Sequence, residues 1–428
     1  MDSHIQLDGE TYLIDTKALC EDSGKRFVLL NPLDGRVISF DAIAVDCRDA
    51  CASKEFTVAK TQFHNMPRHR KEIRDNTISS PEQFSLLSII PNHQCNFNCS
   101  YCYSAGTRNK EKVSIEDIRT CASFILDNIA ADSKSERCFY CSFGGGGEPF
   151  LDWSLIKETI FFTEREAGKR GIETEYSFTS NGSLIRAEQA EFLASRNVKA
   201  VISFEILEEI QNTQRSGHDA VVQGIKTLLQ YDISTTLIST ITPLNVLRQE
   251  EMILCLSRRF PQIRRLSFEP VVSSDLFHDS PQELRDFFMR YTHHFLKAEQ
   301  VALENGITLR SSIRNKTIYL RKKSCIGGFN LTADGITFCP MVSHHSDKRF
   351  PCFSFAMIKN NRLIFDNEKI ANWPPSPPNK FPCPSCFAKW NCGGLCPVAW
   401  SVYSPDMQDE YCFFIKYFTL CVLRKSMG

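Results

Sequence analysis

The feature that most constrains this chain is a repeated alternation, from residue 84 onward, of short apolar runs with longer amphipathic runs. Short runs that alternate with helical patterns indicate β/α units. Six of them predict strands, at residues 84–90, 139–143, 173–179, 200–204, 235–240 and 265–269. Right-handed crossovers curl such a series into a parallel sheet with helices outside. We therefore expect an α/β fold, a partial (β/α)6 TIM-like barrel, with reactive residues at the carboxyl ends of the strands.

Two regions differ from this core and predict three domains. Residues 1–78 contain a hairpin pattern, with apolar runs at 27–30 and 37–40, and no β/α repeat, which predicts a small N-terminal α+β domain. Residues 79–320 form the expected barrel. Residues 321–428 are rich in Cys, Pro and Gly and predict a separate cysteine-rich C-terminal domain.

Composition excludes some classes of partner. The 50 basic and 50 acidic residues give zero formal net charge, so no overall field favours nucleic acid or an anionic membrane. The N-terminus has no signal-peptide pattern, and no apolar run reaches the ~18 residues of a membrane span. We expect a cytoplasmic protein, where a reducing environment keeps the 19 cysteines available for metals.

Three cysteines follow the first expected strand directly. Cys95, Cys99 and Cys102 have the spacing C-x3-C-x2-C. Three thiolates on one short loop can each ligate one iron of a cubane cluster, which leaves the fourth iron open to a substrate. The alternative is a tetrahedral zinc site with His93 as the fourth ligand, although zinc sites usually have paired C-x2-C knuckles.

A glycine run follows the second expected strand, in the sequence Gly-Gly-Gly-Gly-Glu-Pro at 144–149. Residues without Cβ allow a ligand to approach the backbone closely. A phosphate-binding loop is a poor alternative, because no Lys-Ser/Thr pair follows the glycines. The run lies one β/α unit after the cysteine triplet, where a polar cofactor tail would cross the strand ends.

With Tyr101 directly before the third cysteine, the triplet resembles the radical S-adenosylmethionine superfamily. The resemblance implies that Cys95, Cys99 and Cys102 are the catalytic cysteines and hold a 4Fe-4S cluster. The open iron would bind S-adenosylmethionine, and reductive cleavage would yield a 5′-deoxyadenosyl radical that abstracts hydrogen from substrate. The same resemblance implies an external one-electron reductant of the flavodoxin or ferredoxin type.

The resemblance also implies cofactor contacts. Tyr101 would lie near the adenine, a G-G-E-P element would contact the methionyl amino group, and a T-N-G-like turn would supply a further contact. The fourth β/α unit departs from the family pattern. Its Ser203 and Arg215 are still candidates for binding the cofactor carboxylate. The alternative is that Ser203 only ends a strand and that Arg215 lies on the surface. The implied cofactor-binding residues are Tyr101, Gly146, Gly147, Glu148, Asn181, Ser203 and Arg215.

Seven further cysteines form a C-terminal array. Their spacing is a strong metal signal, and two four-ligand sites would need eight. The array resembles the SPASM extension of radical enzymes that modify peptides and proteins, which implies two auxiliary 4Fe-4S clusters and three in all. The implied ligands are Cys325, Cys339 and Cys396 for one cluster, and Cys383, Cys386, Cys392 and Cys412 for the other.

One ligand of the first auxiliary set is missing. Some members of the family have a further cysteine shortly after the first, and here Leu331 occupies that neighbourhood, so this cluster would have an open iron. A second departure is that three residues separate Gly335 from Cys339, where the family usually has four. Cys352 is a candidate for the vacancy, whereas Cys421 would lie on the opposite face of a helix from Cys412. The alternative for the whole array is a zinc knuckle. The pair at 344–345 predicts histidines in an exposed loop.

The resemblance implies an enzyme that matures a ribosomally made precursor peptide or a protein. We expect a thioether crosslink, with carbon-carbon crosslinking and epimerisation as alternatives. A formylglycine-generating sulfatase maturase is less expected, because those enzymes carry an aspartate where Pro340 follows Cys339. A non-catalytic zinc-binding protein is the last alternative. Residues 1–78 are a candidate for recognising a peptide leader.

Overall fold

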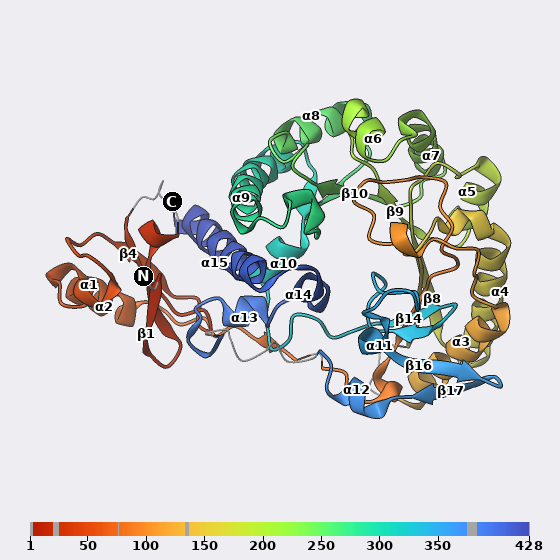
Figure 1. The fold of residues 1–428 in the computed structure, drawn as a ribbon, viewed down its shortest axis with the longest axis horizontal. Helices are drawn as coiled ribbons and strands as arrows, with labels where there is room; N and C mark the ends of the chain where they lie inside the picture. The colour runs from red at the N-terminus through yellow and green to blue at the C-terminus, as the bar shows by residue number, and fades with distance from the viewer. Residues whose placement is uncertain (1–2, 20–24, 76, 133–136, 375–382, 428) are drawn as a thin grey trace.

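A computed structural model describes residues 3–19, 25–75, 77–132, 137–374 and 383–427 (Figure 1). The N-terminal part is a four-stranded antiparallel sheet in chain order, covered by two helices. Its turn at 31–36 is set by Asn31, whose side-chain oxygen accepts from the backbone N–H groups of Leu33 and Asp34. The elements are β1 (His4–Asp8), β2 (Thr11–Asp15), β3 (Phe27–Leu30), β4 (Val37–Phe40), α1 (Cys47–Ala50) and α2 (Lys54–Asn65).

This N-terminal part has a hydrophobic core of its own. Phe27, Phe40, Phe56 and Phe63 pack together in it, separately from the main core of the molecule. The hairpin expected at 27–30 and 37–40 is present as β3 and β4, paired Phe27 to Phe40 and Leu30 to Val37. The residues that alternate with those of this core along β2 and β3, Tyr12, Ile14, Val28 and Leu30, belong to the main core, so the N-terminal sheet also packs against the rest of the molecule.

The main sheet contains seven parallel strands that lie side by side in chain order. All six strands expected from the sequence are among them, and the short β12 is an addition. Buried and half-buried residues alternate along β10, as a strand with one face toward the core requires. The strands are β6 (Leu86–Ile89), β7 (Cys138–Phe143), β8 (Glu173–Ser180), β9 (Lys199–Ser203), β10 (Thr235–Ile241), β11 (Arg265–Pro270) and β12 (Thr308–Arg310).

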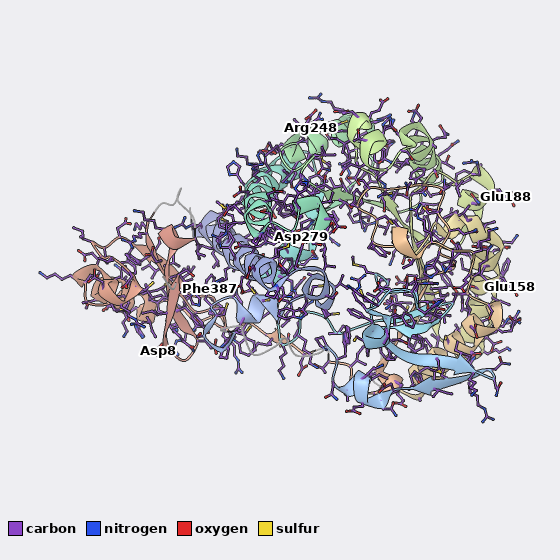
Figure 2. The ribbon with its side chains drawn as sticks, in the orientation of Figure 1. Asp8, Glu158, Glu188, Arg248, Asp279 and Phe387 are labelled. Carbon is purple, nitrogen blue, oxygen red and sulfur yellow. The ribbon has the colours of Figure 1, made fainter. Side chains whose placement is uncertain are left out.

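Helices cover the outer side of this curved sheet (Figure 1). The labelled side chains of Glu158, Glu188 and Arg248 lie on the outer rim, facing away from the strands (Figure 2). Ser114 and Ser280 start two of the helices, because each side chain accepts a backbone N–H of the first turn. The helices are α3 (Ile115–Ala131), α4 (Trp153–Lys169), α5 (Ala187–Ala194), α6 (Glu208–Gln214), α7 (His218–Gln230), α8 (Gln249–Arg259) and α9 (Pro281–Glu304).

The C-terminal region shares the main sheet. Its strand β14 pairs in parallel with β6, and three more strands follow antiparallel, which gives eleven strands in one sheet. The expected division near residue 321 therefore does not divide the sheet. The strands are β14 (Phe329–Thr332), β15 (Gly335–Thr337), β16 (Ser354–Lys359) and β17 (Arg362–Phe365).

Short helices and one long helix complete this region. The long helix packs against α9, where the rings of Phe288 and Phe414 stack at 4.1 Å. A two-stranded pair, β5 (Ile73–Arg74) with β13 (Leu320–Arg321), joins residues near the N-terminal part to it. The helices are α10 (Ser312–Ile318), α11 (Phe350–Phe353), α12 (Asn367–Ala371), α13 (Lys389–Cys392), α14 (Pro397–Val402) and α15 (Pro405–Met427). Among the described residues, no helix is both long and apolar enough to span a membrane.

Helix α7 packs directly on the turn that follows β8, and a glycine makes this possible. A Cβ at Gly224 would lie 1.9 Å from the carbonyl oxygen of Gly182. We expect Gly224→Ala to cost about 1–3 kcal/mol through overpacking. Gly168→Ala in α4, where a Cβ meets nothing within 4 Å, should instead gain about 0.5–1 kcal/mol. Anaerobic thermal unfolding measures both; a Gly224→Ala midpoint equal to the wild type would contradict the packing.

Candidate cofactor and cluster sites

The cysteine triplet lies on the loop between β6 and α3, at the carboxyl edge of the parallel strands. Cys95, Cys99 and Cys102 are free and half-buried. Burial raises the pKa of the Cys95 and Cys99 thiols, and the charge of Cys102 raises the pKa of both further. The loop thus gathers three thiols into mutual electrostatic contact, and a cationic iron cluster would favour their thiolate forms.

The alternative fourth ligand, His93, lies elsewhere. Its side chain is buried and packs edge-on against the ring of His344, with 5.1 Å between ring centroids. Burial lowers the pKa of His93, His344 lowers it further, and Asp334 and Glu111 oppose this. The ring contact that the structure describes for His93 is with His344 and not with a cysteine of the triplet, which favours three thiols as the protein ligands of the triplet site. A set of three protein ligands fits a cluster that has one open iron.

The glycine run is pressed against the start of the triplet loop. The N–H of Gly147 donates to the carbonyl oxygen of Asn92 at 3.0 Å, and the N–H of Glu148 donates to that of Gln94 at 2.7 Å. A Cβ at Gly147 would lie 1.9 Å from the Gln94 oxygen, and Gly146 has a φ of 63°. The glycines thus allow two backbone segments to touch, and a cofactor contact at Gly146 and Gly147 stays a prediction.

Glu148 and Asn181 connect the ends of neighbouring strands. Glu148 is 2% exposed and accepts from Ser180 Oγ at 2.7 Å and from the Asn181 N–H at 2.8 Å. Burial raises the pKa of Glu148, and these hydrogen bonds oppose the rise. Asn181 Nδ2 donates to Asn96 Oδ1 at 2.9 Å, within the triplet loop. The two residues therefore fix the triplet loop relative to β7 and β8.

A buried network joins the triplet loop to the fourth β/α unit. Glu205, which is fully buried, accepts from the hydroxyl groups of Tyr101 and Ser239. Arg215 Nη1 donates to the Tyr101 hydroxyl at 2.9 Å and lies 3.8 Å from Glu205 Oε1. Burial raises the pKa of Glu205, and the positive charge of Arg215 opposes that rise. Ser203 is half-buried at the end of β9.

The side chain of Arg215 is 10% exposed, so the alternative of a surface arginine is wrong. Its Nε is buried and has no hydrogen-bond partner among the described residues. A buried donor without a partner costs about 1–3 kcal/mol, so a ligand acceptor there would be stabilised. The carboxylate of S-adenosylmethionine fits that donor, and the buried thiols fit the cluster.

Glu205 was missed by the sequence interpretation. It was noted only as part of a departure from the family pattern in residues 203–206, with no role assigned. The available signal was an ionisable residue directly after an apolar strand, since a carboxylate in that place must find buried partners. Tyr101 and Arg215 are those partners, and both were already candidates.

The electrostatic influences among the C-terminal cysteine thiols divide them into two groups. Burial raises the pKa of Cys339 to about 12, and the charges of Cys396 and Cys325 raise it further. In the second group, burial raises the pKa of Cys386 to about 11, with further increases from Cys392 and Cys383. Burial and the charges of the same three cysteines, Cys383, Cys386 and Cys392, raise the pKa of the Cys412 thiol. These sets of three and four equal the two ligand sets implied by the SPASM resemblance.

A cavity of about 720 Å³ is lined by all four cysteines of the second group. Lys389, Lys416 and, from the N-terminal part, His4 also line this cavity. Cys352 lies in α11 and is exposed, whereas Cys325, Cys339 and Cys396 are half-buried. Its role as the missing eighth ligand stays a prediction.

Comparison with known proteins gives matches over this region. The Radical SAM superfamily profile matches residues 89–254. The radical SAM cyclopropyl synthase TigE of Paramaledivibacter caminithermalis is 26% identical over 173 residues, covering 38% of this chain and 35% of TigE. A cysteine-type anaerobic sulfatase-maturating enzyme of Clostridium novyi is 22% identical over 307 residues, covering 67% of this chain and 78% of that enzyme. The chain spans 35% to 61% of the length of TigE and of three uncharacterised relatives.

Two solved structures share the fold. Native anSMEcpe with bound AdoMet gives a TM-score of 0.58 at 15% identity, covering 79% of this chain and 99% of that one. Streptococcus suis SuiB bound to precursor peptide SuiA gives 0.52 at 14% identity, covering 89% and 96%. The matched residues 89–254 contain the triplet, the glycine run, Asn181 and Arg215. The chain therefore contains a Radical SAM superfamily domain over residues 89–254.

Proposed function

We propose that this chain is a radical S-adenosylmethionine peptide maturase that installs a crosslink, a thioether by preference, in a ribosomally made precursor peptide. The observation that carries the proposal is the gathering of the C-terminal cysteines into one set of three and one set of four. The fold it shares with SuiB, whose structure holds precursor peptide SuiA, supports a peptide substrate.

Each part of the site has a defined task. Cys95, Cys99 and Cys102 would hold the catalytic cluster, which with S-adenosylmethionine supplies an electron and a 5′-deoxyadenosyl radical that abstracts hydrogen. Arg215 offers Nε to the cofactor carboxylate. Glu148 and Asn181 keep the triplet loop in place. The sets of three and four C-terminal cysteines would hold two auxiliary clusters.

The incomplete set of cysteines explains the preference for a thioether. Forming a carbon-sulfur bond from C–H and S–H removes one hydrogen atom from carbon, one proton from the thiol and one further electron. The site must therefore bind the substrate thiolate and accept an electron. A cluster with three protein ligands, Cys325, Cys339 and Cys396, has room for one external thiolate and is redox-active.

The second candidate function is conversion of a sulfatase cysteine to formylglycine. The relatives named as cysteine-type anaerobic sulfatase-maturating enzymes favour it. Against it stands Pro340, which follows Cys339 where those maturases carry an aspartate. Proline has no side-chain proton acceptor, so this reaction would need another base.

Mass spectrometry after anaerobic co-expression separates the two functions. The partner peptide would be a short cysteine-containing product encoded beside this gene. A peptide mass lower by two hydrogens, with no fragment ions from cleavage between the cysteine and a second residue, would support the crosslinking proposal. Replacement of the cysteine sulfur by a carbonyl oxygen would favour the sulfatase-type function. Unchanged peptide in the presence of S-adenosylmethionine and a flavodoxin-type reductant would contradict both.

Residues 1–78 are proposed to recognise the leader of this peptide. Support comes from Ile43 and Val45, whose apolar side chains are fully or largely exposed between β4 and α1. Leader affinity measured with and without residues 1–78 tests the idea, and equal affinities would overturn it.

Arg215→Lys should weaken S-adenosylmethionine binding about 10- to 100-fold, since a hydrogen bond to a charged group contributes about 1.5–3 kcal/mol. A lysine keeps the charge but loses the Nε donor and the planar fork. Anaerobic equilibrium dialysis measures the affinity. Arg170→Lys, in an ion pair with Asp127 on the outer surface, is the matched control and should bind like the wild type. Equal affinities for both variants would place the carboxylate contact elsewhere.

A further inference from the structure

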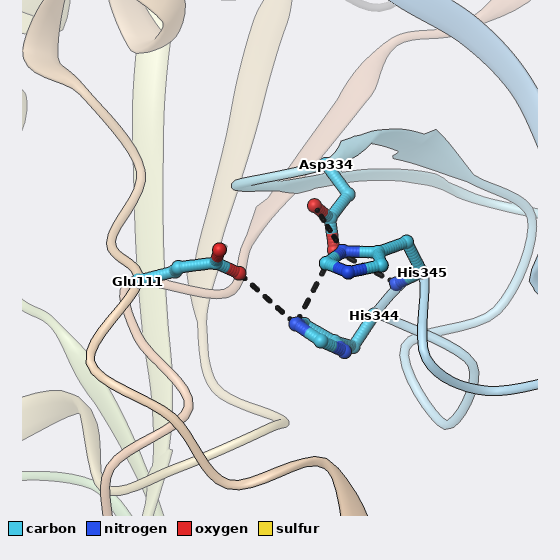
Figure 3. A group of neighbouring side chains, drawn as sticks. All are labelled: Glu111, Asp334, His344 and His345. Carbon is cyan, nitrogen blue, oxygen red and sulfur yellow. Dashed lines mark hydrogen bonds and ion pairs between the residues drawn. The ribbon is translucent and has the colours of Figure 1, made fainter.

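Four side chains from distant parts of the sequence converge beside the cluster loop (Figure 3). Glu111 follows the triplet, Asp334 lies in the turn between β14 and β15, and His344 and His345 follow Cys339. One nitrogen or oxygen atom from each residue lies within 4.8 Å of those from the other three. His344 is buried and His345 exposed, so the expectation of two exposed histidines was wrong for His344.

The spacing of these atoms suits a small cation. His344 Nε2 lies 3.0 Å from Glu111 Oε2 and 3.8 Å from Asp334 Oδ2, and His345 Nδ1 lies 2.9 Å from Asp334 Oδ1. Four ligands placed tetrahedrally about 2.0–2.2 Å from zinc lie about 3.3–3.6 Å from one another. The measured separations straddle this range, so small side-chain movements would complete a tetrahedron.

The orientation of His344 is fixed from its other side. Its Nδ1 lies 2.6 Å from Ser346 Oγ, which turns Nε2 toward Glu111 and Asp334. The Ser346 N–H points at Nδ1, at 3.1 Å, and Asn109 Nδ2 contacts Nε2, so both ring nitrogens have polar neighbours. Metal binding at Nε2 would need the ring proton on Nδ1, where Ser346 Oγ would accept it, as outer-shell partners of ligating histidines do, and would displace the Asn109 amide.

His93 is a second observation that points to a ligand. It is 1% exposed, and neither ring nitrogen has a hydrogen-bond partner within the described residues. Its ring contacts that of His344 at 5.1 Å. A buried imidazole of this kind beside two carboxylates is costly unless it has a partner.

We propose that Glu111, Asp334, His344 and His345 bind a divalent transition metal of the zinc class, with His93 packed behind His344. Two imidazoles with two carboxylates favour zinc or a similar ion, whereas calcium and magnesium prefer oxygen ligands alone. The ion would join the loop after Cys102 to the turn before Cys339. It would therefore couple the position of the catalytic cysteines to that of the first auxiliary set.

The competing state is a metal-free ion-pair network. The carboxylate of Asp334 raises the pKa of His345, which favours an imidazolium there and a direct salt bridge. A surface pair of that kind contributes about 0–1 kcal/mol and needs no cation. The two states differ in whether zinc binds, which makes the metal itself the probe.

The experiment is zinc binding by tag-free, cluster-loaded protein under anaerobic conditions. Equilibrium dialysis against Zn²⁺, with metals counted by mass spectrometry at equal iron and sulfide content, compares the wild type with Glu111→Gln/His345→Gln. Both changed side chains are more than half exposed, so the fold should persist. We expect one zinc per chain in the wild type and at least a tenfold higher dissociation constant in the double variant.

The matched control is His278→Gln/Glu283→Gln, which removes another exposed pair joined at 3.0 Å. It should bind zinc like the wild type. Zinc should also raise the unfolding midpoint of the wild type and of this control, and leave the Glu111→Gln/His345→Gln midpoint unchanged. Equal zinc binding in all three proteins, or no zinc bound by the wild type, would overturn the proposal in favour of the ion-pair network. Neither result depends on peptide crosslinking, so the proposed function is tested separately.

Discussion

Cys99→Ala is expected to reduce formation of 5′-deoxyadenosine to background while leaving the fold intact. The reason is that a cubane cluster held by three thiolates cannot lose one and keep a fixed open iron for the cofactor. Cys99 lies on a loop and not in the packed centre of α3 or the sheet, so its loss should cost little stability. Anaerobic incubation with S-adenosylmethionine and dithionite, followed by liquid chromatography and mass spectrometry, measures the product.

The control is Cys255→Ala in α8, another half-buried cysteine, which belongs to neither cysteine group. It should form 5′-deoxyadenosine at the wild-type rate and keep the wild-type iron content. Cys99→Ala should lose iron only in part, because the C-terminal cysteines are untouched. Undiminished cofactor cleavage by Cys99→Ala would show that the triplet does not hold the catalytic cluster.

The parallel strands could be predicted because the pattern of each strand lies in residues that are close together in the sequence. The short run at 235–240, rich in β-branched residues, is found as β10, and the run at 200–204 is found, shifted by one residue, as β9. Short apolar or β-branched runs between helical segments depend only on neighbours in the chain. The cysteine spacings are local in the same sense, since one short loop determines whether three thiols can share a ligand.

Features that depend on distant contacts could not be predicted. Strand β14 adds to β6 across more than two hundred residues, and nothing in Phe329–Thr332 specifies that partner. Glu111 and His344 meet only because that sheet brings their loops together. A lone glutamate and a histidine carry no spacing signal of their own, so this group became visible only in three dimensions.

Gly147→Ala is expected to remove the catalytic site almost as completely as loss of a cysteine. The added methyl group would lie 1.9 Å from the Gln94 carbonyl oxygen and 2.5 Å from Asn92 Oδ1. It must therefore push the glycine run away from the triplet loop and break the hydrogen bonds to Asn92 and Gln94. Overpacking of this kind costs about 1–3 kcal/mol, and the displaced loop carries Cys95.

Electron paramagnetic resonance of the dithionite-reduced protein separates this effect from general unfolding. In the wild type, adding S-adenosylmethionine should change the cluster signal, and in Gly147→Ala that change should be absent while iron held by the C-terminal cysteines remains. Gly106→Ala is the control on the same loop, because a Cβ there meets nothing within 4 Å. It should respond to the cofactor like the wild type. A full response in Gly147→Ala would mean that contact between the two backbones is not what positions the triplet, and the glycines would then serve the ligand directly.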